Sequence, residues 1–111
     1  MDPNHFQKSS AETVLLALLE GRARHGYELA KLVESKSDSR IQFQVASIYP
    51  MLYRLERKKL VQGKWVEKAG ERRKRFYSLT AAGRKELTAQ RRTWREFFDA
   101  LSSLTGFDHV T

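Results

Sequence analysis

The amino-acid sequence predicts a mainly helical α+β fold in which several helices accompany one two-stranded β-hairpin. Apolar residues recur at helical spacing before residue 60 and after residue 80. Between them, residues 61–67 and 74–79 are rich in β-branched and aromatic side chains, and they flank a charged tetrapeptide that contains Gly70. The length of 111 residues suits a single small domain, and the absence of cysteine excludes disulfides, thiolate metal sites and a cysteine nucleophile.

The N-terminal region is expected to be an arm followed by a first helix. Residues 1–8 show no periodicity, and we expect a flexible arm there. Ser9 and Glu12 have the spacing of a capping box, which predicts a helix over residues 10–20 that ends at Gly21.

A second helix is expected to begin near Gly26 and to end in the serine-rich run 35–39. We expect His25, just before this helix, to make a local hydrogen bond. The three histidines are too scattered to form a metal site. The inner face of the helix is assigned to Tyr27, Leu29, Ala30, Leu32 and Val33.

The third helix, over residues 47–59, has the clearest amphipathic pattern. At 100° per residue, Leu52 and Leu55 lie within about 40° of Ile48, with Met51 beside them, which predicts a buried stripe. Ser47 as N-cap would place Pro50 in the first turn, where no amide is needed. The opposite face carries Pro50, Tyr53, Arg54 and Arg57, flanked by Ser47 and Tyr49.

The hairpin and a last helix complete the chain. Thr80 is expected to cap a helix that runs to about Leu104. Three helices followed by a hairpin describe a winged helix-turn-helix domain, which we assign to residues 9–80, and a C-terminal dimerisation helix and tail occupy residues 81–111.

The basic charge is concentrated in one stretch of the chain. The formal net charge is +8, and residues 54–75 alone contain ten lysines and arginines against three glutamates. Residues 1–53 contain equal numbers of basic and acidic side chains. The excess therefore falls on the third helix and the hairpin, the two elements that a winged helix presents to nucleic acid.

Three segments resemble the PadR family of bacterial transcriptional regulators. They are residues 24–29 (RHGYEL), residues 47–50 (SIYP) with the Leu52, Arg54, Leu55 and Glu56 that follow, and residues 76–83 (FYSLTAAG). The resemblance implies a homodimeric winged-helix repressor that binds a pseudo-palindromic operator in double-stranded DNA. The single C-terminal helix looks like the smaller size class of this family, and a cytoplasmic, nucleoid-associated location is expected.

The DNA contacts are expected on the exposed face of the third helix and along the wing. Arg54 and Arg57 are assigned to the major groove, where an arginine can bind guanine bidentately. Tyr49 could instead pack against the backbone, and Tyr27 and Phe76 are expected in the core. The predicted contact residues are Ser47, Tyr49, Tyr53, Arg54, Arg57, Lys64, Arg72, Arg73, Lys74 and Arg75.

An aromatic stripe on the last helix has two readings, packing on the chain's own first helix or dimerisation, and we predict dimerisation. Trp94 lies where multidrug-sensing relatives have a tryptophan that sandwiches flat aromatic ligands. Trp94 therefore has two readings, the site of a small aromatic effector and simple packing, of which packing is preferred. The predicted interface comprises Val14, Leu18, Leu87, Trp94, Phe97, Phe98, Leu101 and Leu104.

Other function classes find little support in the sequence. No nucleophile–base pair, phosphate loop or carboxylate pair indicates an enzyme, and no cofactor is expected. The apolar run 14–19 is far shorter than the about 20 residues that span a bilayer. Two alternatives stay open: a winged helix that binds DNA or RNA without sequence preference, and a protein–protein adaptor that uses the C-terminal helix.

Overall fold

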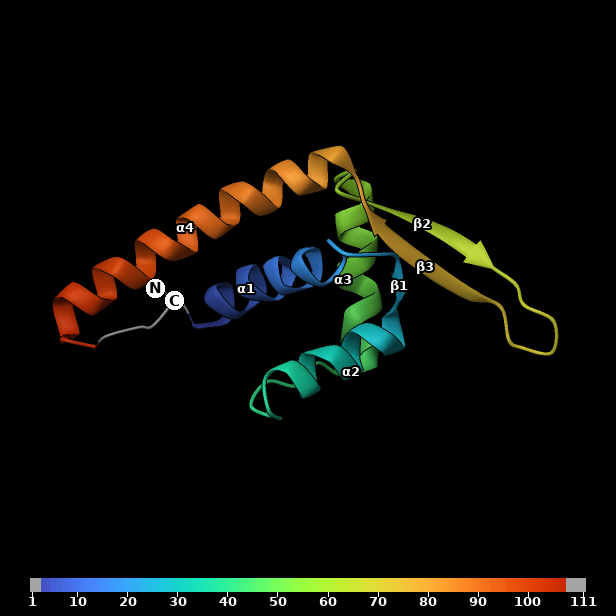
Figure 1. Ribbon diagram of the computed structural model, residues 1–111, viewed down its shortest axis with the longest axis horizontal. Coiled ribbons are helices and arrows are strands. Elements are labelled where there is room, and N and C mark those ends of the chain that lie inside the picture. The colour runs from blue at the N-terminus through green and yellow to red at the C-terminus, as the bar shows by residue number, and fades with distance from the viewer. Residues whose placement is uncertain (1–2, 108–111) are drawn as a thin grey trace.

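The computed structural model describes the backbone of residues 3–107 and the side chains of residues 10–107. The α+β fold is confirmed, with the helices and the hairpin in the predicted order and one additional short strand (Figure 1). The elements are α1 (Pro3–Leu18), β1 (Arg24–His25), α2 (Gly26–Lys36), α3 (Val45–Arg57), β2 (Val61–Val66), β3 (Lys74–Leu79) and α4 (Ala81–Thr105).

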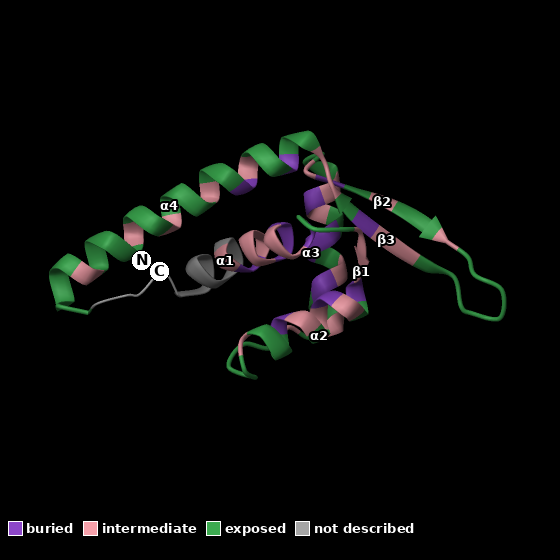
Figure 2. Cartoon of the chain, viewed as in Figure 1, coloured by how far each residue is buried: buried purple, intermediate pink, exposed green. Residues whose placement is uncertain are grey.

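The core lies where α1, α2, α3 and the base of the hairpin meet. The predicted α3 stripe is confirmed, since Ile48, Met51, Leu52 and Leu55 are all buried. Leucines from α1 and α2, together with Tyr77 of β3, fill the space around this stripe. Figure 2 shows that the tip of the hairpin is exposed and that the far half of α4 is mostly exposed, so the core is confined to the middle of the molecule.

Two helix starts differ from the sequence prediction. The first helix begins at Pro3, so the capping box at Ser9 is not used and residues 3–8 are helical instead of forming an arm. Proline is favoured at the first helical position, where its missing amide costs nothing. Residues 1–2 lie outside the described range.

The start of α3 lies two residues before the predicted one. Gln44 is the N-cap in an extended conformation, and it makes no side-chain capping bond. Pro50 is consequently the sixth helical residue, beyond the first turn, and it cannot donate to the carbonyl of Ala46. Both residues are exposed, so water can bind this carbonyl.

A strand of two residues, β1, joins the hairpin and was missed by the sequence analysis. The sheet order is β1-β3-β2, with both pairs antiparallel, and Arg24 and His25 lie opposite Tyr77 and Phe76. The predicted local bond of His25 is confirmed: its Nδ1 accepts from the Glu28 amide at 3.3 Å and caps α2. The base of the wing is thereby tied to the start of α2.

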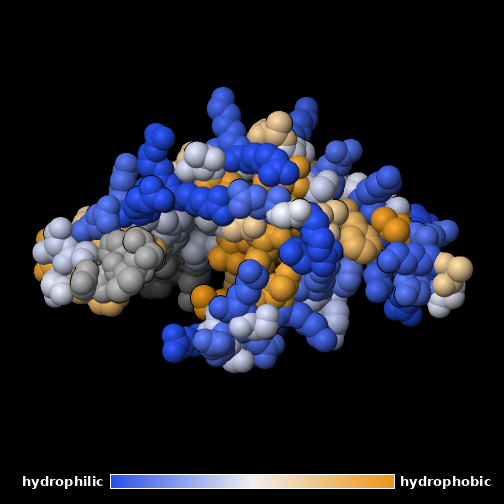
Figure 3. Space-filling model, in the orientation of Figure 1, coloured by the Kyte–Doolittle hydropathy of each residue, from blue (hydrophilic) through white to orange (hydrophobic). Residues whose placement is uncertain are grey.

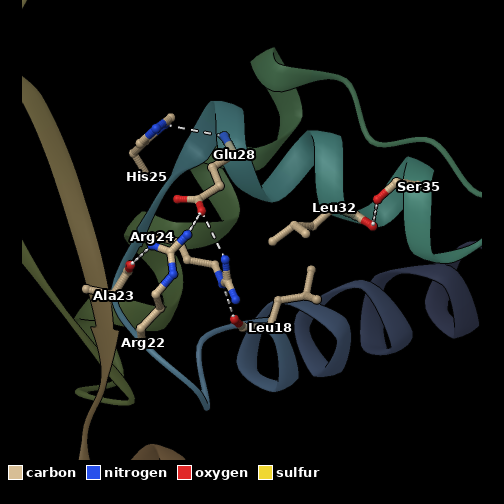
Figure 4. A network of polar contacts seen from close by, with 8 residues as sticks. All are labelled: Leu18, Arg22, Ala23, Arg24, His25, Glu28, Leu32 and Ser35. Atoms are coloured by element: carbon tan, nitrogen blue, oxygen red, sulfur yellow. Dashed lines mark hydrogen bonds and ion pairs between the residues drawn. The ribbon is translucent and has the colours of Figure 1, made fainter.

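A network of arginines connects the end of α1 to the first turn of α2 (Figure 4). Arg24 Nε donates to the Leu18 carbonyl at 2.8 Å, and its Nη1 donates to Glu28 at 2.9 Å. Arg22 pairs with the same carboxylate. The open carbonyl end of α1 is therefore held against α2 by charged hydrogen bonds.

The first turns of α4 pack tightly on the domain. Thr80 Oγ1 accepts from the Gly83 amide at 2.9 Å, which confirms the predicted cap. Gly83 leaves no room for a side chain, since a Cβ there would lie 2.0 Å from the Leu60 carbonyl oxygen. Leu87 is 1% exposed and belongs to the core of its own chain, so its assignment to a dimer interface was wrong.

Beyond Leu87, α4 runs back along α1 (Figure 1). Arg91 binds the Glu20 carboxylate through two hydrogen bonds of 2.9 and 3.0 Å. Within the described part of the chain, no helix is long and apolar enough to cross a membrane.

Candidate nucleic-acid interface

The exposed face of α3 lies opposite its buried stripe, as the helical period predicted. Tyr53 is 48% exposed, and Arg57 and Pro50 are exposed beside it. Arg57 makes no ion pair with any described residue. This face therefore offers a phenol and an unengaged guanidinium to a partner.

Arg54 lies on the flank of this face that turns toward α1. Its Nε is 3.8 Å from Glu12 Oε1, and the Nζ of Lys58 is 3.3 Å from the other oxygen of the same carboxylate. Arg54 is half-buried, and its 3.8 Å contact with Glu12 is longer than a hydrogen bond. Glu12 therefore lies beside the Arg54 guanidinium without fixing it through a hydrogen bond.

Tyr49, on the opposite flank, packs on α2 and also lines the surface between α3 and the wing. Its ring packs on Gly26, where a Cβ would lie 2.7 Å from the ring carbon Cζ. The same Cβ would lie 2.9 Å from the Tyr49 hydroxyl, so the whole ring end is in contact with Gly26. Ser47 is exposed on α3 but does not cap the helix.

The wing presents most of its predicted cations to solvent. Lys64, Arg72 and Lys74 are exposed, and none of them forms an ion pair with a described residue. The guanidinium of Arg73 lies 4.6 Å from the centre of the Trp65 ring and 3.8 Å from Glu67. Trp65 itself is exposed, so the stacked pair forms one side of the wing.

Arg75 differs from the other wing cations and corrects its sequence assignment. It forms two hydrogen bonds to Glu56, of 2.9 and 2.8 Å, and its guanidinium stacks on Tyr77. The Glu56 carboxylate raises the pKa of Arg75 above its usual value, and burial raises the pKa of Tyr77. Arg75 is therefore engaged within the chain, because α3 and β3 bring together two residues that lie far apart in the sequence.

An open concavity of about 520 Å³ separates α3 from the wing, and its lining combines rings and cations. Tyr27, which the sequence analysis placed in the core, belongs to this surface: it is 54% exposed, and the Lys31 amino group lies 5.1 Å from its ring centre. On a helical wheel Tyr27 lies on the face opposite the buried Leu29, so the helical period could have predicted that it is exposed. The lining residues are His25, Tyr27, Tyr49, Tyr53, Trp65, Arg72, Arg73, Lys74 and Arg75.

A second apolar surface lies at the other end of the molecule, on α1 and α4, where Trp94 and Phe97 are half-buried. The rings of Trp94, Phe97 and Phe98 form a cluster with centre-to-centre distances of 5.8 to 5.9 Å. Leu101, Leu104 and Phe107 continue it toward the end of α4, and Leu104 is 84% exposed. Figure 3 shows apolar surface in the hollow below α4, over the position that α1 occupies in Figure 1. Val14 and Leu18 of α1 are half-buried.

Comparison with known proteins identifies the family of this chain. Residues 15–89 match the family model of the PadR-like transcriptional regulators. The chain belongs to the PadR-like family. The predicted family is thus confirmed, and with it the winged-helix fold of a DNA-binding transcriptional regulator.

Solved structures share the fold of this PadR-like protein. A transcriptional regulator from Clostridium thermocellum is 22% identical, with a TM-score of 0.80 over 87% of this chain and 94% of that chain. A PadR family regulator from Clostridium difficile is 26% identical, with a TM-score of 0.70 over 84% and 94% of the two chains. Bacillus subtilis PadR, solved in complex with operator DNA, is 21% identical, with a TM-score of 0.67 over 72% of this chain and 45% of that chain.

Proposed function

We propose that this PadR-like protein is a homodimeric repressor that recognises a pseudo-palindromic operator through α3 and the wing. The observation that carries the proposal is the surface between these elements, where the exposed rings of Tyr27, Tyr53 and Trp65 gather beside Arg72 and Lys74, two cations that form no ion pair with a described residue. The operator complex of the Bacillus subtilis relative supports duplex DNA as the partner.

In this proposal α3 enters the major groove with its exposed face toward the bases. An α-helix fits the width of this groove, and an arginine there can bind guanine bidentately, which discriminates by about 1–3 kcal/mol. Arg57 and Arg54 are the base-reading candidates, and Tyr53 contacts a base or sugar. Tyr49 and Ser47 contact the adjoining backbone.

The wing contacts phosphates or the neighbouring minor groove. Lys64, Arg72 and Lys74 carry charge that no described carboxylate neutralises, so each can displace condensed counterions from the duplex. Arg73 presents its charge from the face of Trp65. These contacts add affinity without reading sequence.

Dimerisation through α4 and α1 supplies the two-fold symmetry. The aromatic cluster of α4 and the exposed Phe98, Leu101 and Leu104 form the surface that we assign to a second copy of the chain. Two α3 helices would then enter successive major grooves, with half-site centres about 34–36 Å apart. A flat aromatic effector would enter at Trp94, and quenching of Trp94 fluorescence in a Trp65→Phe background tests for one.

Selection of bound sequences from a random DNA pool, followed by titration of the selected duplex against salt, tests the proposal. We expect an enriched inverted repeat and an affinity that falls steeply as salt rises. Enrichment of no sequence, or equal competition by structured RNA, would favour non-specific binding. A monomer that shifts no DNA would favour an adaptor.

Repression itself is tested with a reporter gene placed behind the selected operator. We expect expression to fall when the protein is produced and to recover when the operator is scrambled. An increase in expression would identify an activator.

A further inference from the structure

The ion pair between Glu56 and Arg75 joins the recognition helix α3 to the wing. One carboxylate oxygen of Glu56 accepts from Arg75 Nη1 at 2.9 Å, and the other accepts from Nη2 at 2.8 Å. The second oxygen also accepts from the backbone amide of Gly63 at 3.2 Å. A single side chain of α3 is therefore bonded to both strands of the hairpin.

The surroundings of Arg75 hold its guanidinium in this position. The group lies 5.3 Å from the ring centre of Tyr77, and Nη1 is 3.4 Å from the Tyr77 hydroxyl. Gly63 leaves the space that the guanidinium fills, since a Cβ there would lie 2.6 Å from Arg75 Cζ. Arg75 Nε is buried without a hydrogen-bond partner among the described residues, which is a cost that the bidentate pair offsets.

The pair lies near the supported end of the hairpin, and the rest of the hairpin extends away from the domain. β1 supports the hairpin only at Tyr77 and Phe76, and beyond them the two strands pair with each other alone. Lys74 lies three residues beyond Tyr77, about 10 Å along an extended strand, and Arg72 lies farther out. A small rotation of the hairpin at its base therefore displaces the exposed cations by a larger distance.

We propose that Glu56 and Arg75 are positioning residues that fix the angle of the wing on α3, so that wing and helix engage DNA together. This inference rests on the proposed function and concerns the same surface. In this inference Arg75 does not contact DNA, because its guanidinium pairs with Glu56 within the protein. The wing cations that contact DNA are Lys64, Arg72 and Lys74.

Glu56→Ala distinguishes a positioning role from a purely electrostatic one, because the two predict opposite changes in DNA affinity. Glu56→Ala removes a negative charge from a DNA-binding face and frees Arg75, so electrostatics alone predicts tighter binding to every duplex and a steeper salt dependence. If the pair positions the wing, Glu56→Ala instead weakens binding to the selected operator. Glu67→Ala, in the exposed wing loop, makes the same charge change without touching the pair.

Gly63→Ala probes the pair with no change of charge. Its Cβ would displace the end of the flexible Arg75 side chain, which can move away without unfolding the chain. We expect it to weaken operator binding in the same way as Glu56→Ala.

The experiment measures dissociation constants for the selected operator and for a random duplex over a range of salt, with thermal unfolding of each variant as a check. We expect Glu56→Ala and Gly63→Ala to weaken operator binding by about tenfold or more. Binding to a random duplex should change by no more than about twofold, because α3 fixes no register there and a displaced wing can still reach phosphates. The operator salt slope should fall by about 0.9 for each wing cation that no longer reaches a phosphate. Glu67→Ala should bind at least as tightly as the wild type.

Operator binding by Glu56→Ala that equals or exceeds that of the wild type would overturn the proposal. If Glu56→Ala does not fold at the assay temperature, operator binding by Gly63→Ala decides whether the proposal holds. If neither variant folds, the ion pair is required for folding, and the positioning role is refuted. A wild-type protein that fails to distinguish the operator from random DNA would refute the proposed function itself, whatever the variants do.

Discussion

Lys59 adopts a left-handed backbone conformation, with φ of 63°, directly after α3. The Leu60 amide donates to the Leu55 carbonyl at 3.0 Å and the Lys59 amide to the Glu56 carbonyl at 2.9 Å, so the helix ends in a Schellman motif. This position favours glycine, because a Cβ costs about 1–2 kcal/mol there. Lys59→Gly is therefore expected to raise the free energy of unfolding by about 0.5–1 kcal/mol, measured by urea denaturation.

The neighbouring residue provides the matched control. Lys58 has right-handed helical geometry, and its substitution removes the same charge together with the exposed ion pair to Glu12, so Lys58→Gly should lower stability. A Lys59→Gly variant no more stable than the wild type would contradict the argument.

His25 links the stability of α2 to pH. Its Nδ1 can accept the Glu28 amide only while the ring is neutral, and burial, followed by the charge of Lys74, lowers its pKa. This contribution to stability is complete above the ordinary histidine pKa of about 6.5, and it is lost as the pH falls from there through the lowered value.

His25→Asn should remove this part of the pH dependence, because asparagine caps helices and does not titrate. Urea denaturation between pH 5 and 8 measures it, those limits being about 1.5 units either side of the histidine pKa. A variant with the same slope as the wild type would show that His25 is not responsible.

At the scale of elements, α3 and the wing are expected to divide base reading from phosphate binding. Arg54→Ala should relax sequence preference at one base pair of each half-site, with a loss of about 1–3 kcal/mol on the operator. Lys74→Ala should weaken operator and random duplexes alike and reduce the salt slope by about 0.9 for each subunit. Titrations with both duplexes compare the two variants, and equal losses of preference would refute the division.

Local periodicity explains which elements could be predicted from the sequence. The α3 stripe and the Thr80 cap depend on residues close together in the chain, and both were predicted correctly. The starts of α1 and α3 were not, because Ser9 and Ser47 carry capping signals that the folded chain does not use. Sequence pattern alone cannot choose between competing helix starts.

Interactions between distant elements explain the remaining differences. The strand β1 has two residues and no pattern of its own, and it forms because β3 is beside it. Arg75 looks like any other cation of its basic run until folding places Glu56 next to it. The sequence therefore indicated the region of the candidate site. It did not distinguish Arg75, which is paired within the protein, from the wing cations that are exposed.

At the scale of the whole molecule, α4 contributes separately to folding and to assembly. Its first turns hold Leu87 in the core, whereas the cluster of Trp94 and Phe98 lies farther out, and Phe98 is 42% exposed. Truncation near Trp94 should therefore weaken the proposed dimer, and truncation at Leu87 should unfold the chain. Comparing the two truncations separates the contribution of α4 to folding from its contribution to dimerisation.

Trp94→Ala is expected to shift the monomer–dimer equilibrium toward monomer and to reduce operator affinity in parallel, because a monomer holds only one half-site. Sedimentation velocity gives the dimer constant, and titration at matched protein concentration gives the affinity. Leu87→Ala should instead cost about 2–5 kcal/mol of unfolding free energy. An unchanged dimer in Trp94→Ala would place the interface elsewhere, and a weakened dimer with undiminished operator affinity would mean that each subunit recognises its half-site alone.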